Sequence, residues 1–98
     1  MKTITPDEVL KKIDEGQEIN IIDVREPEET ATGKINIAQT IPLGTLEFHL
    51  EELDKNLEYI MVCRSGRRSA QATSFLEENG YNATNMEGGM LAWEGPIE

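Results

Sequence analysis

The sequence has little of several residue types, and each shortage narrows what the protein can be. One cysteine among 98 residues excludes an intramolecular disulfide, and one histidine leaves too few ligands for a Cys/His zinc cluster. We therefore expect no metal site and no cofactor. Nine basic residues stand against 19 acidic ones, and the formal net charge of −10 disfavours binding to nucleic acid or to an anionic membrane.

Long hydrophobic runs are also missing. No run approaches the roughly 20 apolar residues of a membrane span, and residues 1–10 have no signal-peptide hydrophobic region. We expect a cytoplasmic protein that does not bind membranes and is a monomer. The length suits one domain covering residues 1–98.

Helix and strand patterns alternate along the chain. Pro6 follows a threonine cap and precedes a capping-box glutamate, which predicts a helix that stops at Gly16. Two further helices are predicted over residues 43–53 and 69–79, and a short helix or turn around residues 26–29. Apolar runs predict strands over residues 19–24, 35–41, 59–62 and 82–86. Continuously apolar strands that alternate with helices favour an α/β fold with a parallel sheet covered on both faces.

Cys63 lies where such a sheet places its ligands, just beyond the end of a strand. The reactive form of cysteine is the thiolate, and a free thiol with a pKa of about 8.5 is mostly protonated at neutral pH. A loop leading into a helix supplies unpaired N–H groups that favour an anion, and Gly66 permits a curl that points them inward. We therefore predict that Cys63 is a nucleophile.

The distribution of arginine supports this prediction. All four arginines lie at positions 25, 64, 67 and 68, whereas the five lysines are scattered. Arg64, Arg67 and Arg68 make a local positive region in an acidic chain, and planar guanidinium groups suit an oxyanion such as thiosulfate. A lone cysteine at a strand end is more often a small buried hydrophobe, but this glycine-containing, arginine-rich loop reverses that preference.

Four segments together resemble the motifs of one family. Residues 63–68, C-R-S-G-R-R, fit the C-x-x-G-x-R loop of rhodanese domains at every fixed position. Residues 23–26 resemble the D-x-R-[ED] segment, residues 33–42 the G-H-I…A…I-P segment and residues 88–93 the G-G-x…W ending. The chain thus resembles a single-domain rhodanese over nearly its whole length. Lys34 replaces the usual histidine and Ile37 the usual small residue, both outside the loop.

This resemblance implies a single rhodanese-like α/β domain with a five-stranded, mainly parallel sheet and helices on both faces. It implies a sulfurtransferase in which Cys63 takes a sulfur from thiosulfate or a similar donor and passes it to cyanide, a small thiol or a protein acceptor. Backbone N–H groups of residues 64–69 would stabilise the sulfur anions. The substrate-binding residues implied are Arg64, Ser65, Gly66, Arg67, Arg68 and Ser69.

Other notable residues receive structural interpretations. We expect Asp23 and Arg25 to form an ion pair that orients the loop from behind, because buried charges need partners. The glycines at 88 and 89 predict a turn, and Trp93 is expected in the core. His49 lies among acidic residues on a solvated face and receives no role.

Three alternative functions stay open. Phosphatases and arsenate reductases of related fold need C-x5-R, but here Ser69 stands six positions after Cys63 and Arg68 comes one position too early. A non-catalytic binding module is a second alternative, although such modules typically lack the cysteine. A persulfide carrier that serves a partner enzyme is the third, and the sequence does not separate it from a free-standing enzyme.

Overall fold

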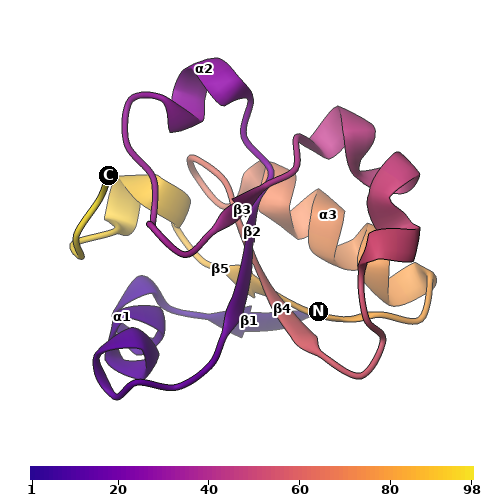
Figure 1. The fold of residues 1–98 in the computed structure, drawn as a ribbon, viewed down its shortest axis with the longest axis horizontal. Helices are drawn as coiled ribbons and strands as arrows, with labels where there is room; N and C mark the ends of the chain where they lie inside the picture. The colour runs from indigo at the N-terminus through magenta and orange to yellow at the C-terminus, as the bar shows by residue number, and fades with distance from the viewer.

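A five-stranded parallel sheet forms the centre of the structure, a computed structural model that describes residues 1–98 (Figure 1). The strands are β1 (Lys2–Ile4), β2 (Asn20–Asp23), β3 (Gln39–Thr40), β4 (Glu58–Val62) and β5 (Asn82–Met86). They lie in the order β1-β5-β4-β2-β3, and every neighbouring pair is parallel. The predicted α/β fold with a five-stranded sheet is therefore confirmed, and the sheet is parallel throughout.

Helices cover both faces of this sheet. They are α1 (Pro6–Asp14), α2 (Pro27–Thr30), the 3₁₀ helix η1 (Leu43–Glu52), α3 (Arg67–Glu78) and the 3₁₀ helix η2 (Gly89–Ala92). Figure 1 shows α1 on one side of the sheet and α3 with η1 on the other. The predicted capping box of α1 is present, because the Thr5 hydroxyl accepts the Glu8 N–H at 3.1 Å and the Glu8 carboxylate accepts the Thr5 N–H at 3.0 Å.

Each face of the sheet has its own hydrophobic core. Met61 and Cys63 belong to the cluster beneath α3 and η1, whereas Ile60 and Val62 belong to the cluster beneath α1. Successive side chains of a strand point to opposite faces, so β4 must be apolar at both sets of positions. This two-sided burial explains the continuous apolar run before Cys63.

Two predicted elements differ from the structure, and one strand was not predicted. Residues 35–41 were expected to form one strand, but only Gln39–Thr40 pair with β2, because the chain turns with a hydrogen bond from Ala38 N–H to the Ile35 carbonyl. A helix is predicted over residues 43–53, and Leu43–Glu52 form a 3₁₀ helix. Strand β1 was not predicted, because three residues are too few to show a period.

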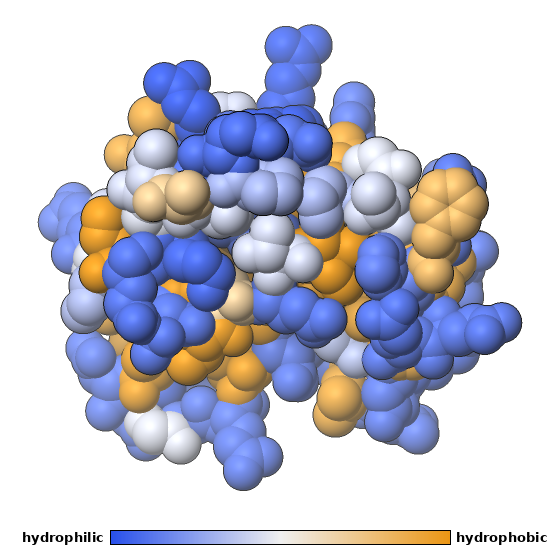
Figure 2. Space-filling view, turned by 45° about the horizontal axis from the view of Figure 1, so that its top comes forward, coloured by the Kyte–Doolittle hydropathy of each residue, from blue (hydrophilic) through white to orange (hydrophobic).

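The register of the sheet brings two loops together at its carboxyl edge. Asp23 at the end of β2 is the register partner of Val62 at the end of β4. Consequently the segment that leads to α2 and the loop that leads to α3 begin side by side, and Figure 1 shows both at the same end of the sheet. None of the helices is long and apolar enough to cross a bilayer. Figure 2 shows a face on which hydrophilic side chains are interspersed with hydrophobic patches.

Candidate active site

The sulfur of Cys63 lies at the centre of the loop between β4 and α3. It accepts the Gly66 N–H at 3.1 Å and lies 3.3 Å from the Ser69 hydroxyl oxygen. Cys63 is 0% exposed and packs in the core beneath α3. The sulfur thus replaces the side-chain cap that the N-terminus of α3 lacks, since Gly66 has no side chain to fill that role.

These contacts decide the charge of the sulfur. Burial raises the pKa of the Cys63 thiol, but hydrogen bonds that the thiolate can accept from the Ser69 hydroxyl and from the backbone of Ser69, Gly66 and Ser65 lower it more, and the balance lies below the ordinary value. Hydrogen bonds to the anionic form are the physical cause. The loop therefore favours a thiolate more than water does.

The loop keeps its N–H groups pointing inward because its carbonyl groups are bound on the outside. The Cys63 carbonyl accepts the Met90 N–H and the Arg64 carbonyl accepts the Leu91 N–H, both at 2.9 Å. The Asn85 side-chain amide donates to the Gly66 carbonyl at 3.1 Å. Helix η2 and strand β5 thus fix the outer side of the loop, so that an anion nest needs little reorganisation when charge develops.

Two glycines allow this arrangement. Gly66 has a φ of +95°, a left-handed conformation that other residues rarely adopt. At Gly89, a Cβ atom would lie 2.5 Å from the carbonyl oxygens of both Cys63 and Arg64. The predicted turn at residues 88–89 is therefore also the surface against which the loop packs, a role that no local pattern in the sequence indicates.

Ser69 connects the sulfur to β5. Its hydroxyl donates to the Asn85 side-chain oxygen at 2.6 Å while it contacts the Cys63 sulfur. Ser69 is predicted to bind substrate, but its side chain is buried beneath the loop and faces the Cys63 sulfur. Asn85 was not singled out from the sequence. Its signal is strand alternation, since it lies two positions after Ala83 and so on the face of β5 that α3 covers.

Arg68 forms a two-pronged ion pair with Glu29 of α2. The two guanidinium nitrogens donate to the two carboxylate oxygens at 2.6 and 2.8 Å, and the side chains are 34% and 30% exposed. The hydrogen bonds from Arg68, followed by the Glu26 N–H, lower the pKa of Glu29 from its ordinary value to about 2. The Arg68 guanidinium, which is predicted to bind a donor anion, is therefore bound to Glu29 instead.

Asp23 and Arg25 form the expected ion pair, with a shortest distance of 2.8 Å and both side chains almost fully buried. The guanidinium also donates to the Gly33 carbonyl at 2.9 Å and to the Glu29 carbonyl at 3.4 Å. These bonds hold the segment around α2 in place. Through Glu29, this segment in turn contacts Arg68 in the first turn of α3.

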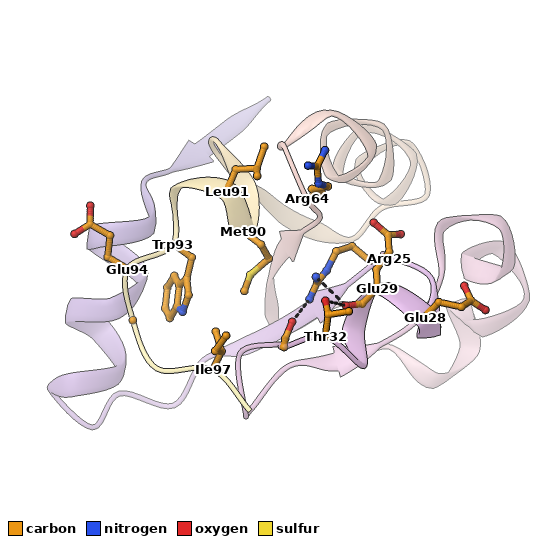
Figure 3. Close-up of a pocket in the computed structure, with 12 residues that line it drawn as sticks. Arg25, Glu28, Glu29, Thr32, Arg64, Met90, Leu91, Trp93, Glu94 and Ile97 are labelled. Atoms are coloured by element: carbon orange, nitrogen blue, oxygen red, sulfur yellow. Dashed lines mark hydrogen bonds between the residues drawn. The ribbon is translucent and has the colours of Figure 1, made fainter.

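A cleft of about 570 Å³ opens beside the loop (Figure 3). Arg64 lies at its edge, and Met90, Trp93 and Ile97 face Arg25 across it. Trp93 is half-buried, and its indole N–H donates to the Pro96 carbonyl. Of the loop cations, Arg64 and Arg67 are exposed, and neither forms an ion pair.

The structure contains no group of three or more His, Cys, Asp or Glu side chains that could hold a metal ion. His49 contacts Glu52 at 2.7 Å on the surface of η1 and is not part of the loop between β4 and α3. The chemical groups at the site are one thiol, its hydrogen-bond donors and nearby guanidinium groups.

Comparison with known proteins gives a consistent match. The family model described as the rhodanese-like domain matches residues 5–96. YtwF of Bacillus subtilis (strain 168), which carries a provisional sulfurtransferase name, is 44% identical over 95 residues, 97% of this chain and 92% of that protein. A sulfurtransferase of Allochromatium vinosum is 31% identical over 91 residues, 92% of this chain and 85% of that protein.

A solved structure is similar over the same length. The crystal structure of a rhodanese-like domain protein from Staphylococcus aureus superposes with a TM-score of 0.94 at 47% identity, covering 100% of this chain and 97% of that one. The similarity thus includes both the sheet and the loops at its carboxyl edge.

Proposed function

The chain belongs to the rhodanese-like domain family, and we propose that it is a sulfurtransferase that carries sulfur as a persulfide on Cys63. Thiosulfate or a related sulfane compound is the donor, and cyanide, a small thiol or a protein thiol is the acceptor. The observation that carries this proposal is the Cys63 sulfur itself, which lies 3.1 Å from the Gly66 N–H inside a loop whose carbonyl groups are bound on the outside.

The first half-reaction loads the sulfur. The Cys63 thiolate attacks the outer sulfur of thiosulfate, a new S–S bond forms, and the bond between the two thiosulfate sulfurs breaks. Sulfite leaves with the bonding electron pair, and the persulfide keeps one negative charge. The N–H groups of Ser65, Gly66 and Ser69 stabilise the thiolate before the attack.

The second half-reaction returns the enzyme to its starting form. Cyanide or a thiolate attacks the outer sulfur of the persulfide, a bond forms between acceptor and sulfur, and the S–S bond breaks. The product is thiocyanate or a new persulfide, and Cys63 is again a thiolate. No oxidant, reductant or metal enters the balance.

Donor binding uses the cations that surround the loop. Arg64 and Arg67 are exposed and can hold the sulfonate end of thiosulfate. Arg68 can do so only after it exchanges its bonds with Glu29 for bonds to the donor. Since Cys63 is 0% exposed, loading also requires a small displacement of the loop side chains that opens a path to the sulfur.

A sulfur-transfer assay tests this function. Purified protein is mixed with thiosulfate and either cyanide or glutathione, and the formation of thiocyanate or sulfide is followed beside the Cys63→Ser variant. We expect turnover that depends on protein concentration and is absent in the variant. An aryl phosphate is tested in a separate assay. Hydrolysis of the aryl phosphate without any sulfur transfer would indicate a phosphatase and contradict the proposal.

A further inference from the structure

Four groups around the active sulfur form a closed ring of hydrogen bonds. The ring runs from the Cys63 sulfur to the Ser69 hydroxyl at 3.3 Å and on to the Asn85 oxygen at 2.6 Å. It returns from the Asn85 nitrogen to the Gly66 carbonyl and from the Gly66 N–H to the sulfur, both at 3.1 Å. No buried side-chain nitrogen or oxygen lacks a partner. Each proton in the ring can therefore be assigned.

The assignment starts from the Gly66 carbonyl, which can only accept. The NH₂ group of Asn85 must face it, so the oxygen of Asn85 must face Ser69. Ser69 has a single hydroxyl proton, and it donates this proton to Asn85. The Ser69 oxygen can then only accept from Cys63. The ring as found consequently fits a protonated thiol that donates to Ser69.

Loss of the thiol proton breaks this pattern. A thiolate has no proton to donate, so it and the Ser69 oxygen would face each other with lone pairs only. Ser69 can turn its hydroxyl toward the sulfur, but the buried oxygen of Asn85 then loses its donor. A buried acceptor without a donor is costly. Asn85 and the thiolate therefore compete for one proton.

We propose that Asn85 is a positioning residue for sulfur transfer, because it competes with the empty Cys63 sulfur for the Ser69 hydroxyl and so favours the sulfur-loaded form. In the persulfide the negative charge lies on the outer sulfur, and the inner sulfur is neutral. Ser69 can then return its hydroxyl to Asn85 without opposing an anion. This part of the inference rests on the proposed function, whereas the competition for the proton does not.

Two single variants have opposite expected effects on the Cys63 thiol. Ser69→Ala removes a donor to the thiolate, so we expect the pKa of Cys63 to rise. Asn85→Leu removes the competing acceptor at similar volume, so we expect the ionisation constant to increase by a factor of about ten. If Asn85 served only to order the loop, its loss would loosen the Gly66 N–H and raise the pKa instead.

A double variant isolates the hydroxyl. In the Ser69→Ala background no proton is left to share, so Asn85→Leu should change the ionisation constant by less than about twofold. Thr84→Val is the matched control, because Thr84 is the adjacent buried residue of β5 and its side chain takes part in none of the ring's hydrogen bonds. Asn85→Ala replaces Asn85→Leu if the leucine variant does not fold.

Charged groups near the loop are the same in all these variants. They come from the end of β2, from α2 and the residue before it, from the loop and α3, and from the residue after β5: Asp23, Arg25, Glu26, Glu29, Arg64, Arg67, Arg68 and Glu87. Differences between variants therefore report on the ring rather than on these charges.

The experiment titrates Cys63 by the ultraviolet absorbance of the thiolate and by the rate of alkylation with iodoacetamide against pH. No sulfur donor is present, so the result is independent of the proposed function. An increased ionisation constant in Asn85→Leu that disappears in the Ser69→Ala background supports the proposal. A decreased or unchanged constant, or an effect that persists without Ser69, overturns it.

A second measurement tests the loaded form. Protein loaded with thiosulfate is equilibrated with glutathione, and the fraction of Cys63 that keeps the sulfur is read from intact mass. We expect this fraction to be lower in Asn85→Leu than in wild type and unchanged in Thr84→Val. An equal or higher fraction contradicts the favoured loaded form, whereas failure of every protein to gain sulfur contradicts the proposed function alone.

Discussion

The loops that follow β2 and β4 begin side by side at the same edge of the sheet, yet they treat charge in opposite ways. After β2, the Asp23 carboxylate is satisfied by the guanidinium and backbone N–H of Arg25, two residues later. After β4, backbone N–H groups converge on the Cys63 sulfur, and no cationic side chain donates a hydrogen bond to it.

This difference distinguishes a structural loop, residues 23–26 at the end of β2, from an anion-binding loop, residues 63–68 after β4. A buried ion pair with all its partners present is rigid, and it has no capacity left for a ligand. A nest of N–H groups around a titratable sulfur stabilises charge that appears only during reaction. The first loop holds α2 in position, and α2 then contacts the second loop through Glu29 and Arg68. The following predictions test this division.

The largest effect on sulfur transfer is expected in the anion-binding loop. Cys63→Ser leaves a hydroxyl that cannot attack a sulfane sulfur at neutral pH, so sulfur transfer should be lost entirely. The unfolding free energy should change by no more than about 2 kcal/mol, because the two side chains have similar size. Transfer assays and urea unfolding on the same preparation check both statements, and residual turnover would move the chemistry away from Cys63.

A substitution in the structural loop should instead lower the stability of the fold. Asp23→Ala leaves the Arg25 guanidinium buried without its carboxylate, which should lower the unfolding free energy by about 3–5 kcal/mol. Urea unfolding measures the loss, with Glu18→Ala as an exposed acidic control. A loss below about 1 kcal/mol would mean that the ion pair does not hold this loop in place.

A substitution in the turn that packs against the anion-binding loop should lower the unfolding free energy less than Asp23→Ala does. Gly89→Ala places a methyl group 2.5 Å from two loop carbonyl oxygens, which should cost about 2–4 kcal/mol and reduce sulfur transfer. Gly16→Ala is the control, since Gly16 also has a positive φ but no atom within 4 Å of the added Cβ. Equal losses in the two variants would assign the whole effect to backbone strain.

The contact between the two loops should show in acid. The pKa of Glu29 is about 2 in the folded protein and lies below its ordinary value of 4.5, so its stabilising contribution is present above pH 4.5 and is lost as the pH falls toward 2. Because the pair is about one-third exposed and screened by water, we expect a loss of roughly 1 kcal/mol. Urea unfolding against pH should show this decrease in wild type and a smaller one in Glu29→Gln.

The smallest effect concerns donor binding. Glu29→Gln keeps an oxygen for the Glu26 N–H but releases Arg68, so the KM for thiosulfate should fall about two- to fivefold. Steady-state kinetics with varied thiosulfate measure this change. Glu28→Gln removes the same charge without touching Arg68, and an equal fall there would indicate general electrostatic repulsion instead.

Much of the fold could be predicted because its signals are local. The apolar run of β4 and the capping box of α1 are properties of neighbouring residues, and each predicts its element without knowledge of the rest. Residues 35–41 misled the prediction because their apolar positions suit a strand, whereas Ile35 and Ala38 are buried through a turn. Tertiary packing decided that segment.

The candidate site divides in the same way. Cys63, Gly66 and the arginines of the loop lie within a few positions of one another, so their chemistry is visible in the sequence. Glu29 and Arg68 are 39 positions apart, and no periodicity relates them. Asn85 reaches the loop only because β5 lies next to β4 in the sheet. Partners that the topology brings together needed the structure.

The most direct test of a sulfur-carrying Cys63 is its mass. Intact mass spectrometry before and after treatment with thiosulfate, followed by fragmentation, should find one added sulfur atom located on Cys63 and removed again by cyanide. A protein that gains no sulfur from thiosulfate or from any small persulfide, although its thiol can be alkylated, would contradict the account.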